Sequence, residues 1–578
     1  MHKPDITPGL AELRAARRGS NRLLGSALLF SVFVNMLMLI GPLFMLQVYD
    51  RVLGSRSEET LTALFVLVSF LYLMMGLLDY ARGRVMARVA ARFQSGLDGR
   101  VFAAALKQAS MGQRDQKPSA PQRDLDAVQR LIGSPVMLSF FDIPFTPFFL
   151  AGIFVFHTYL GSLAILGGAV LVGVALLNQM RTRTSVQEAA MAAARADVLA
   201  QHLRADAETV RSLGMQGAAL SRWQSLRQGA LAAQIGTQDR AGGFTTVSKT
   251  FRLFLQSAML ALGAWLVLRG EMTAGAMIAA SILLGRALAP VEQVIGQWTL
   301  LQAAVKGWSD LGKLLEDFPT EPARTSLPKP KALLEVQQLT VIPPGETQAA
   351  LRMVSFVVKP GQAVGVIGPS GAGKSTLARA LTGMWRPAAG RVRLDGATLD
   401  QYDPDILGQH IGYLPQRVSL FDGTIAENIA KLAPQPDAAK VVEAAKKAAA
   451  HDMILRLPQG YDTRVSATGG RLSGGQMQRI GLARAMYGDP AILVLDEPNS
   501  NLDNDGSVAL NAAIRQMKSE GKSVLIMAHR PAAIQECDLL LLLDGGLAKA
   551  FGPRDEVLRS TVRNHADIQR AQGGGGVT

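Results

Sequence analysis

The chain has 578 residues, more than one ordinary hydrophobic core organises, so two or more domains are expected. Its formal net charge of +14 would suit nucleic acid, but the first half of the chain alternates long apolar runs with arginine clusters, which disfavours that partner. The single cysteine, Cys537, excludes both a disulfide framework and a Cys-rich metal site.

Six runs in the first half of the chain are apolar enough to form membrane-spanning helices. Most approach the ~20 residues that cross ~30 Å of hydrocarbon at ~1.5 Å per residue, and the last two are shorter. The third run is interrupted only by Asp142, and the sixth contains Arg286. The runs cover residues 23–49, 60–78, 131–156, 159–180, 253–268 and 273–288.

Basic residues around these runs predict how the chain is oriented in the membrane, because cytoplasmic loops are enriched in Lys and Arg. The connections at 52–59, 157–161 and 269–271 are short and hold few net positive charges, so we expect them outside. Arginines gather before the first run, after the second and after the fourth: Arg14, Arg17, Arg18, Arg22, Arg82, Arg84, Arg88, Arg92, Arg181 and Arg183. We therefore expect a cytoplasmic arm at 1–22, a membrane domain at 23–318 and both termini in the cytoplasm.

Two connections on the inner side, 79–130 and 181–252, are long and have a helical pattern. They could be solvated helical hairpins. Their length favours a second interpretation, in which they extend past the membrane surface and act as levers on a soluble domain.

Polar residues inside the apolar runs need a physical reason, because charge is costly in hydrocarbon. Asp142 lies near Pro144 and Pro147, which should kink the third span. Further candidates for an internal face are Asn35, Arg286 and Glu292. Either these residues form buried ion pairs or lie at the membrane edge, or they line a translocation pathway.

A proline-rich linker at 319–333 separates the membrane domain from a region with an α/β pattern at 334–567. There the strand-like AVGVIG leads into a glycine-rich loop and then the helix-like STLARALTGM, the context that a P-loop requires. Backbone N–H groups of such a loop bind nucleotide phosphates, its lysine pairs with the β- and γ-phosphates, and its serine binds Mg²⁺. The predicted nucleotide-binding residues are Gly368, Pro369, Ser370, Gly371, Ala372, Gly373, Lys374, Ser375 and Thr376.

A second strand-like segment, AILVLDEP, ends in two carboxylates. Asp496 is predicted to hold Mg²⁺, and Glu497 to be the general base for the attacking water, an effect of roughly 10²–10⁴-fold. Adjacent acids could also mark a solvated turn, but the P-loop upstream makes this improbable. Gln416 and His529 follow two further strand-like segments and suit γ-phosphate sensing, with Gln416 also a candidate Mg²⁺ ligand.

The order of motifs resembles the nucleotide-binding domain of an ABC transporter: the P-loop, GYLPQ, LSGGQ, LDEP, SNLD and MAH. Six spans before one such domain resemble an ABC exporter half-transporter. The segments GPLFMLQVYDRVLGSRSEETL, APVEQVIGQW and IGYLPQRVSLFDGTIAENIA are similar to type I secretion permease/ATPases of the metalloprotease-exporter branch.

The resemblance implies a homodimer in the bacterial inner membrane, in which LSGGQ of one copy caps the γ-phosphate held by the P-loop of the other. It implies nucleotide contacts from Ser473, Gly474, Gly475, Gln476 and Asp503, and coupling elements near 111–120 and 206–214. It further implies export of unfolded proteins with C-terminal signals, powered by ATP and Mg²⁺, together with a periplasmic adaptor and an outer-membrane channel. The membrane lipids are the remaining partner, and nucleic acid is not expected.

Two departures from the family pattern concern the nucleotide and the coupling. No aromatic residue occurs from Leu339 to Gln348, so adenine is expected on Val341, Ile342 or a proline, with relaxed base selectivity. The segment before LSGGQ, VSATGGR, lacks the usual glutamate.

The two ends of the chain carry expectations of their own. Only about twenty residues precede the first span, too few for the peptidase-like domain of some relatives, so we expect no leader processing. The glycine-rich tail at 568–578 is expected to be disordered.

Two other functions remain open from the sequence. An ABC exporter of lipids or drug-like molecules would share the spans and the motor. A membrane-anchored regulatory ATPase without transport is disfavoured by the long inner helices and the proline-kinked span.

Overall fold

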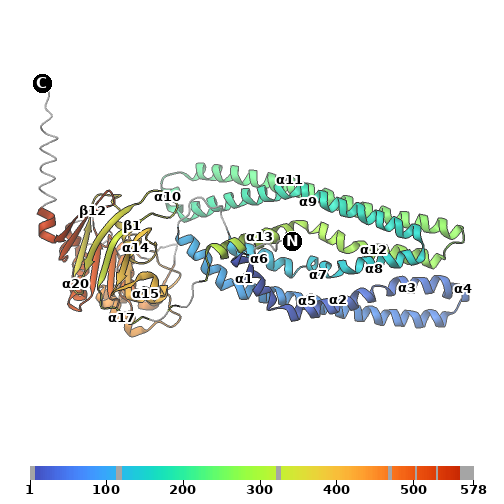
Figure 1. Ribbon diagram of the computed structural model, residues 1–578, viewed down its shortest axis with the longest axis horizontal. Coiled ribbons are helices and arrows are strands. Elements are labelled where there is room, and N and C mark those ends of the chain that lie inside the picture. Colours follow the sequence, from blue (N-terminus) through green and yellow to red (C-terminus); the bar gives the residue numbers. More distant parts are fainter. Residues whose placement is uncertain are drawn as a thin grey trace, which may run out of the picture. The chain divides into compact units, whose positions relative to one another are not determined.

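The computed structural model describes residues 7–111, 120–320, 324, 327–466, 472–500, 504–528 and 531–559. The chain forms two compact units, and the main boundary between them lies between Thr320 and Glu321. In the described residues the first unit is helical, and the strands belong to the second (Figure 1). This is the predicted architecture of a helical membrane domain followed by an α/β domain.

Among its described residues, the first unit contains six helical segments long and apolar enough to cross a membrane, which agrees with the predicted number. Its short elements are α1 (Pro8–Arg18), α2 (Asn21–Leu37), α3 (Ile40–Gln47), η1 (Val48–Val52), α4 (Leu53–Ser55), α6 (Pro121–Ile132), α7 (Pro135–Asp142), η2 (Ile143–Phe145), α8 (Thr146–Phe156) and α10 (Ala207–Ser212). Its long helices are α5 (Glu58–Ser110), α9 (Thr158–Ala205), α11 (Gln216–Leu268), α12 (Ala274–Gly296) and α13 (Trp298–Asp317).

The third span is broken where its prolines predict a kink. Helix α7 ends at Asp142, Pro144 lies in a single 3₁₀ turn, and α8 begins at Thr146. Pro147 stands in the first turn of α8, where its missing N–H has no helical partner to lose. The inner connections are helical as expected: α5, α9 and α11 each run far beyond the length that hydrocarbon requires.

A buried polar network joins three spans of this unit. The Arg82 guanidinium on α5 donates to Asp142 Oδ1 on α7 at 2.7 Å, to Asp79 at 2.6 Å and to Ser31 Oγ on α2 at 3.1 Å. Asn35 Nδ2 donates to the same Asp142 oxygen at 2.7 Å. The structure thus places Asp142 in a buried ion pair, the first of the two interpretations that the sequence left open.

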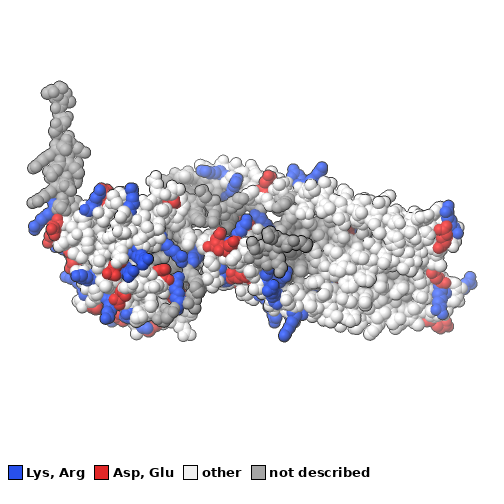
Figure 2. Space-filling view, viewed as in Figure 1, with Lys and Arg blue, Asp and Glu red and all other residues white. Residues whose placement is uncertain are grey.

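Charge is unevenly distributed over the first unit. Figure 2 shows the apolar part of the spans almost bare of Lys, Arg, Asp and Glu on the visible face, with charged side chains at its two ends. Large apolar side chains such as Phe65, Leu73 and Phe148 are exposed there. Such a surface fits a hydrocarbon environment, in which apolar side chains face outward at no cost.

The second unit is built on two main sheets. One is antiparallel, in the order β2-β1-β4-β5; the other is mainly parallel, in the order β12-β11-β3-β10-β9-β6. The strands of the antiparallel sheet are β1 (Leu334–Val341), β2 (Leu351–Val358), β4 (Ala389–Leu394) and β5 (Ala397–Thr398). Those of the other sheet are β3 (Ala363–Ile367), β6 (Ile411–Leu414), β9 (Ile492–Asp496), β10 (Ser523–Met527), β11 (Leu539–Asp544) and β12 (Leu547–Pro553), while β7 (Gly423–Thr424) pairs with β8 (Arg464–Val465).

Helices cover both faces of the parallel sheet, so its central strands are apolar throughout. Every residue of β9 is buried, and its side chains alternate between two hydrophobic cores: Ile492 and Val494 in one, Leu493 and Leu495 in the other. The helices and helical turns of this unit are α14 (Lys374–Leu381), η3 (Leu399–Gln401), α15 (Pro404–His410), α16 (Ile425–Ile429), α17 (Ala438–Lys447), α18 (His451–Leu455), η4 (Gly460–Asp462), α19 (Gly474–Met486), α20 (Asn504–Ser519) and η5 (Pro531–Ile534), of which α14, α15, α19 and α20 pack on the parallel strands.

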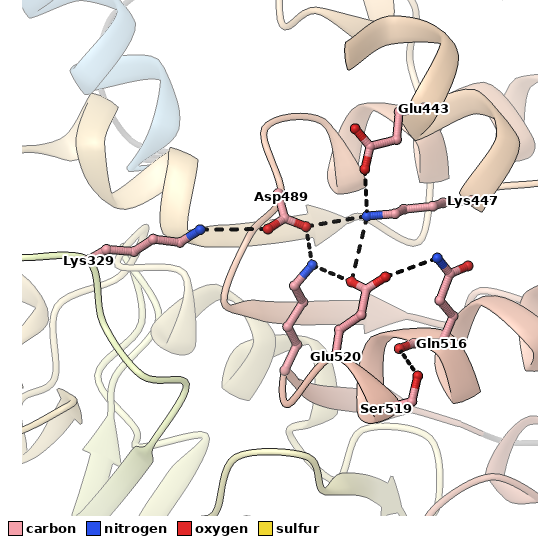
Figure 3. A network of polar contacts seen from close by, with 8 residues as sticks. Lys329, Glu443, Lys447, Asp489, Gln516, Ser519 and Glu520 are labelled. Atoms are coloured by element: carbon pink, nitrogen blue, oxygen red, sulfur yellow. Dashed lines mark hydrogen bonds and ion pairs between the residues drawn. The ribbon is translucent and has the colours of Figure 1, made fainter. Parts of the chain in front are cut away.

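An ion-pair network surrounds Asp489, in the turn that leads from α19 into β9 (Figure 3). Asp489 contacts Lys447 of α17 at 3.4 Å, Lys329 of the linker at 3.6 Å, and Lys522. Glu520 accepts from Lys522 at 2.6 Å. Burial alone would raise the pKa of Asp489, but Lys522 and Lys447 outweigh it and hold the pKa below its ordinary value. The network connects the linker, the last residue of α17 and the turns that precede β9 and β10, at the amino-terminal end of those strands.

Candidate nucleotide site

The P-loop connects the end of β3 to the start of α14, as predicted. Gly373 caps α14 with φ +99°, a conformation that favours glycine, and a Cβ there would lie 2.7 Å from a Leu351 side-chain carbon. A Cβ on Gly368 would lie 2.1 Å from the Leu543 carbonyl oxygen. These two positions exclude any side chain, so the loop stays close to the neighbouring strands.

Lys374 lies at the centre of this loop. Its ammonium donates to the carbonyl oxygens of Gly368 and Pro369 at 2.7 and 2.9 Å, which holds the side chain inside the loop. Burial lowers the pKa of Lys374, and the carboxylates of Glu497 and Asp496 act against that shift. The ammonium is therefore held inside the glycine-rich loop as a charged donor.

Parallel pairing brings the other predicted residues to the same edge. Strands β6, β9, β10 and β3 run parallel, so the segments that follow them meet at one end of the sheet. Ser375 Oγ donates to Asp496 Oδ1 at 3.3 Å. Gln416 Nε2 donates to Glu497 Oε2 at 3.0 Å. Four of the predicted site residues thus form two contacting pairs beside the P-loop.

The backbone of Glu497 explains how two successive carboxylates serve one site. In a continuing strand, adjacent side chains would point to opposite faces of the sheet. Glu497 instead has φ +51°, in the left-handed region, and its N–H donates to the Met527 carbonyl of β10 at 3.0 Å. A non-glycine residue in this conformation carries strain of order 1–3 kcal/mol, which is common at functional sites. The turn lets the Glu497 carboxylate contact Gln416 while Asp496 contacts Ser375.

The Asp496 carboxylate is subject to opposing electrostatic effects. Burial raises the pKa of Asp496, and the charge of Glu497 adds to this, while the Ser375 hydroxyl, Arg379 and Lys374 act in the opposite direction. A cation bound beside Asp496 would act in the same direction as Arg379 and Lys374, because its charge would stabilise the ionised carboxylate. Ser375 and Asp496 supply the hydroxyl and carboxylate oxygens that Mg²⁺ prefers. Within the described residues, no group of three or more His, Cys, Asp or Glu side chains is arranged to hold a metal ion by itself.

The LSGGQ segment begins helix α19. Ser473 is its N-cap: the hydroxyl accepts from Gln476 N at 3.3 Å, and Gln476 Oε1 accepts from Ser473 N at 2.9 Å. The helix starts at Gly474, so both glycines belong to its first turn. Ser473 and Gly474 are exposed. In the described part of the chain no hydrogen bond joins this turn to the P-loop, so it presents a free helix N-terminus, a favourable position for an anion.

Two residues that the sequence did not single out anchor α19, one of them to the site. Gln478, 2% exposed, donates from Nε2 to the Pro498 carbonyl at 2.6 Å and to the Glu497 carbonyl at 3.4 Å. Arg484 donates to the Asn428 carbonyl and to Asn428 Oδ1, both at 2.8 Å. A glutamine two positions after LSGGQ, on the inner face of a helix, was the available signal for Gln478. The Gln478 contacts fix α19 relative to the Glu497 turn, and the Arg484 contacts join it to α16.

Some predictions fall on residues that the structure does not describe. His529 and Asp503 lie outside the described residues, as do most of 111–120, most of VSATGGR and the tail at 568–578. At the expected adenine position, Val341 is fully buried in the core, so its side chain is not free to contact a base. Ile342 is 40% exposed directly beyond the end of β1, and of the two prolines that follow, Pro343 is buried and Pro344 is half-buried, so Ile342 and Pro344 remain as candidate apolar surfaces.

Comparisons with known proteins agree with this geometry. Residues 24–289 match the family model of the ABC transporter transmembrane region, and residues 351–500 match that of the ABC transporter. The type I secretion system ATP-binding protein PrsD of Rhizobium meliloti is 44% identical over 92% of both chains. The cyclolysin secretion/processing ATP-binding protein CyaB of Bordetella pertussis is 30% identical over 96% of this chain and 78% of its own length.

A solved structure shows the same fold. The structure of a bacterial Atm1-family ABC exporter with ATP bound superposes with a TM-score of 0.81, covering 96% of this chain and 99% of that chain. Its sequence identity is 24%, so the likeness concerns the fold. The arrangement of six spans followed by a P-loop domain is confirmed.

Proposed function

The chain belongs to the ABC transporters, as a half-transporter of the exporter type related to type I secretion ATPases, and on this premise we propose how it works. It is an ATP-driven exporter of the inner membrane. We propose that it acts as a homodimer with both termini in the cytoplasm, and that its cargo is unfolded protein with a C-terminal signal. A periplasmic adaptor and an outer-membrane channel complete the path.

The exposed first turn of α19 is the observation that carries the dimer. Ser473 and Gly474 present a capped helix N-terminus that no described group of the P-loop engages. Helix N-termini attract phosphate through free N–H groups and the helix dipole. A second copy in head-to-tail arrangement would bring this turn against the γ-phosphate held by Lys374, so that each copy supplies half of each site.

The chemistry follows from the paired residues at the sheet edge. Lys374 and the N–H groups of the P-loop bind the phosphates, and Ser375 with Asp496 would hold Mg²⁺, which neutralises phosphate charge when bound. Glu497 takes a proton from the attacking water as it reaches the γ-phosphate. Gln416, which donates to Glu497, orients that carboxylate and detects the γ-phosphate. We assign His529 to the same sensing role and Asp503 to the dimer contact.

Coupling to the membrane unit is assigned to the ends of the long inner helices. Helix α10 is a short connection between α9 and α11, and nearly all of its residues are exposed. We propose that it and the segment near 111–120 contact the nucleotide domains. ATP-driven closure of the dimer would then move the spans.

Isolation of the exporter from native membranes tests the cargo and the partners. The Glu497→Gln variant, trapped with ATP, should retain an adaptor, an outer-membrane channel and an unfolded protein whose C-terminal segment is required for retention. The wild-type protein supplied with ADP is the control and should retain less. Recovery of tightly bound lipid or small molecules without any of these proteins would instead support an exporter of lipids or drug-like molecules.

A further inference from the structure

Arg286 is a charged residue inside a membrane span, and the mechanism above gives it no role. Arg286 lies twelve residues after Ala274, the first residue of the 23-residue helix α12. At ~1.5 Å per residue this places it roughly 18 Å along the helix, near the middle of ~30 Å of hydrocarbon. An ionised side chain at that depth is among the costliest in a membrane protein and is retained at functional positions.

The face of α12 that carries Arg286 is the one that the unit leaves partly open. The opposite face is buried by α3, α8, α9 and α11 through Ala280, Leu284, Ala287 and Leu288. Arg286 and Ile282, one turn apart, are only half-buried, and Ala289 is exposed. Lipid would be an unfavourable environment for this guanidinium, so the open face is better suited to a protein-lined or hydrated space.

Arg286 has no hydrogen bond, ion pair or ring contact within the described residues. Two other polar side chains of α12 are paired. Glu292 contacts Arg252 at 2.8 Å, and Gln293 accepts from Ser139 at 2.7 Å. Within the described residues Arg286 is therefore unpaired, whereas Glu292 and Gln293 of the same helix are paired.

Neither the chain itself nor lipid offers a counter-charge at this depth. The six apolar runs contain one carboxylate, Asp142, and Arg82 and Asn35 already engage it. A second copy would bring the same residues in the same pairs. Lipid phosphates lie roughly 15 Å from the middle of the hydrocarbon, beyond the reach of an arginine side chain.

We propose that Arg286 binds carboxylates of the exported polypeptide as it passes the middle of the membrane, and so selects for acidic cargo. This inference rests on the proposed function, since it requires polypeptide cargo and a pathway along α12. A guanidinium matches the planar, two-oxygen geometry of Asp, Glu and a chain terminus. In the transport cycle such contacts must form and break repeatedly, which suits a cation without a permanent partner.

Binding of two matched unfolded polypeptides to the purified homodimer in lipid nanodiscs tests the proposal. One probe carries evenly spaced Asp in a Gly/Ser background, and the other carries Asn at the same places. The wild-type protein should bind the Asp probe about tenfold more tightly, the effect expected of one charge-assisted hydrogen bond. The preference should be lost in Arg286→Gln, persist in part in Arg286→Lys, and reverse toward a Lys-bearing probe in Arg286→Glu.

Ile282→Gln is the matched control, because it adds the same amide one turn away on the same face and leaves the cation in place. It should keep the preference, and ATP occlusion should be unchanged in all variants. An Arg286→Gln protein that still prefers the Asp probe overturns the proposal, as does a wild-type protein that binds both probes equally. Loss of ATP occlusion in the wild-type protein contradicts the proposed function instead, and absence of binding to either probe with occlusion intact contradicts both.

Discussion

Replacing Arg82 with alanine should destabilise the membrane unit by about 3–5 kcal/mol, the cost of leaving a buried charge without its partner. The Arg82 side chain is 6% exposed and that of Asp142 is 12% exposed, so water compensates for little of the loss. After the substitution Asp142 would keep only its hydrogen bond from Asn35. The Asp79 contact adds little to this figure, because the Asp79 side chain is 55% exposed.

Two further variants separate this reasoning from general sensitivity of the spans. Asp79→Ala removes an exposed partner of the same guanidinium and should cost no more than ~1 kcal/mol. The double variant Arg82→Met with Asp142→Leu removes both charges and should lie close to the wild-type protein, because apolar residues of similar size tolerate the same site.

Thermal unfolding in detergent, followed by tryptophan fluorescence, ranks these variants. The midpoint should be lowest for Arg82→Ala, with Asp79→Ala and the double variant both near wild type. If the double variant unfolds as early as Arg82→Ala, the loss comes from packing and the argument from buried charge is wrong.

Three other predictions concern the nucleotide domain. Glu497→Gln should keep ATP affinity and slow turnover by roughly 10²–10⁴-fold, because the amide cannot accept a proton; near-normal turnover in a purified sample removes Glu497 from the role of base. Discrimination between ATP and GTP should stay below ~100-fold, since Ile342 offers apolar contact without a π-face; competition binding measures this, and a larger ratio means that another group recognises the base. Asp489 and Glu520 have lowered pKa values, so their contribution to stability is complete above the ordinary values of 3.8 and 4.5 and is lost as the pH falls below them. Acid unfolding of the nucleotide domain should therefore depend less on pH in Asp489→Asn, and an unchanged pH profile would contradict the network's role.

Much of the fold followed from local patterns. Long apolar runs predicted the six spans, and strand, glycine-rich loop and helix predicted the P-loop, because these signals lie within single segments of the sequence. Pairings between distant segments were not accessible in the same way. Arg82 belonged to a cluster that set the orientation, yet in the structure it turns inward and binds Asp142 of another span. Nothing in the sequence indicated which arginine of the cluster would turn inward.

In the candidate site, too, motifs within single segments predicted the residues, but contacts between distant segments were not predictable. Ser375, Gln416, Asp496 and Glu497 were found from motifs, and the parallel sheet explains why they meet. The left-handed backbone at Glu497 depends on a hydrogen bond to β10 and could not be predicted from LDEP alone. Val341 was offered as a surface for adenine, but its side chain faces the core, because the last residue of a strand follows the alternation of that strand.

The central claim is that the first turn of α19 acts on nucleotide bound by another copy. Two variants test it, Lys374→Ala and Ser473→Arg, each also carrying Glu497→Gln so that bound ATP is trapped. Either homodimer should occlude little ATP, because each of its sites contains one damaged half. In an isolated mixed dimer, action across the interface places both lesions in one site and leaves the other intact, so about one ATP per dimer should be occluded. Mixed dimers that occlude no more than either homodimer would show that α19 acts on its own chain and would contradict the proposed assembly.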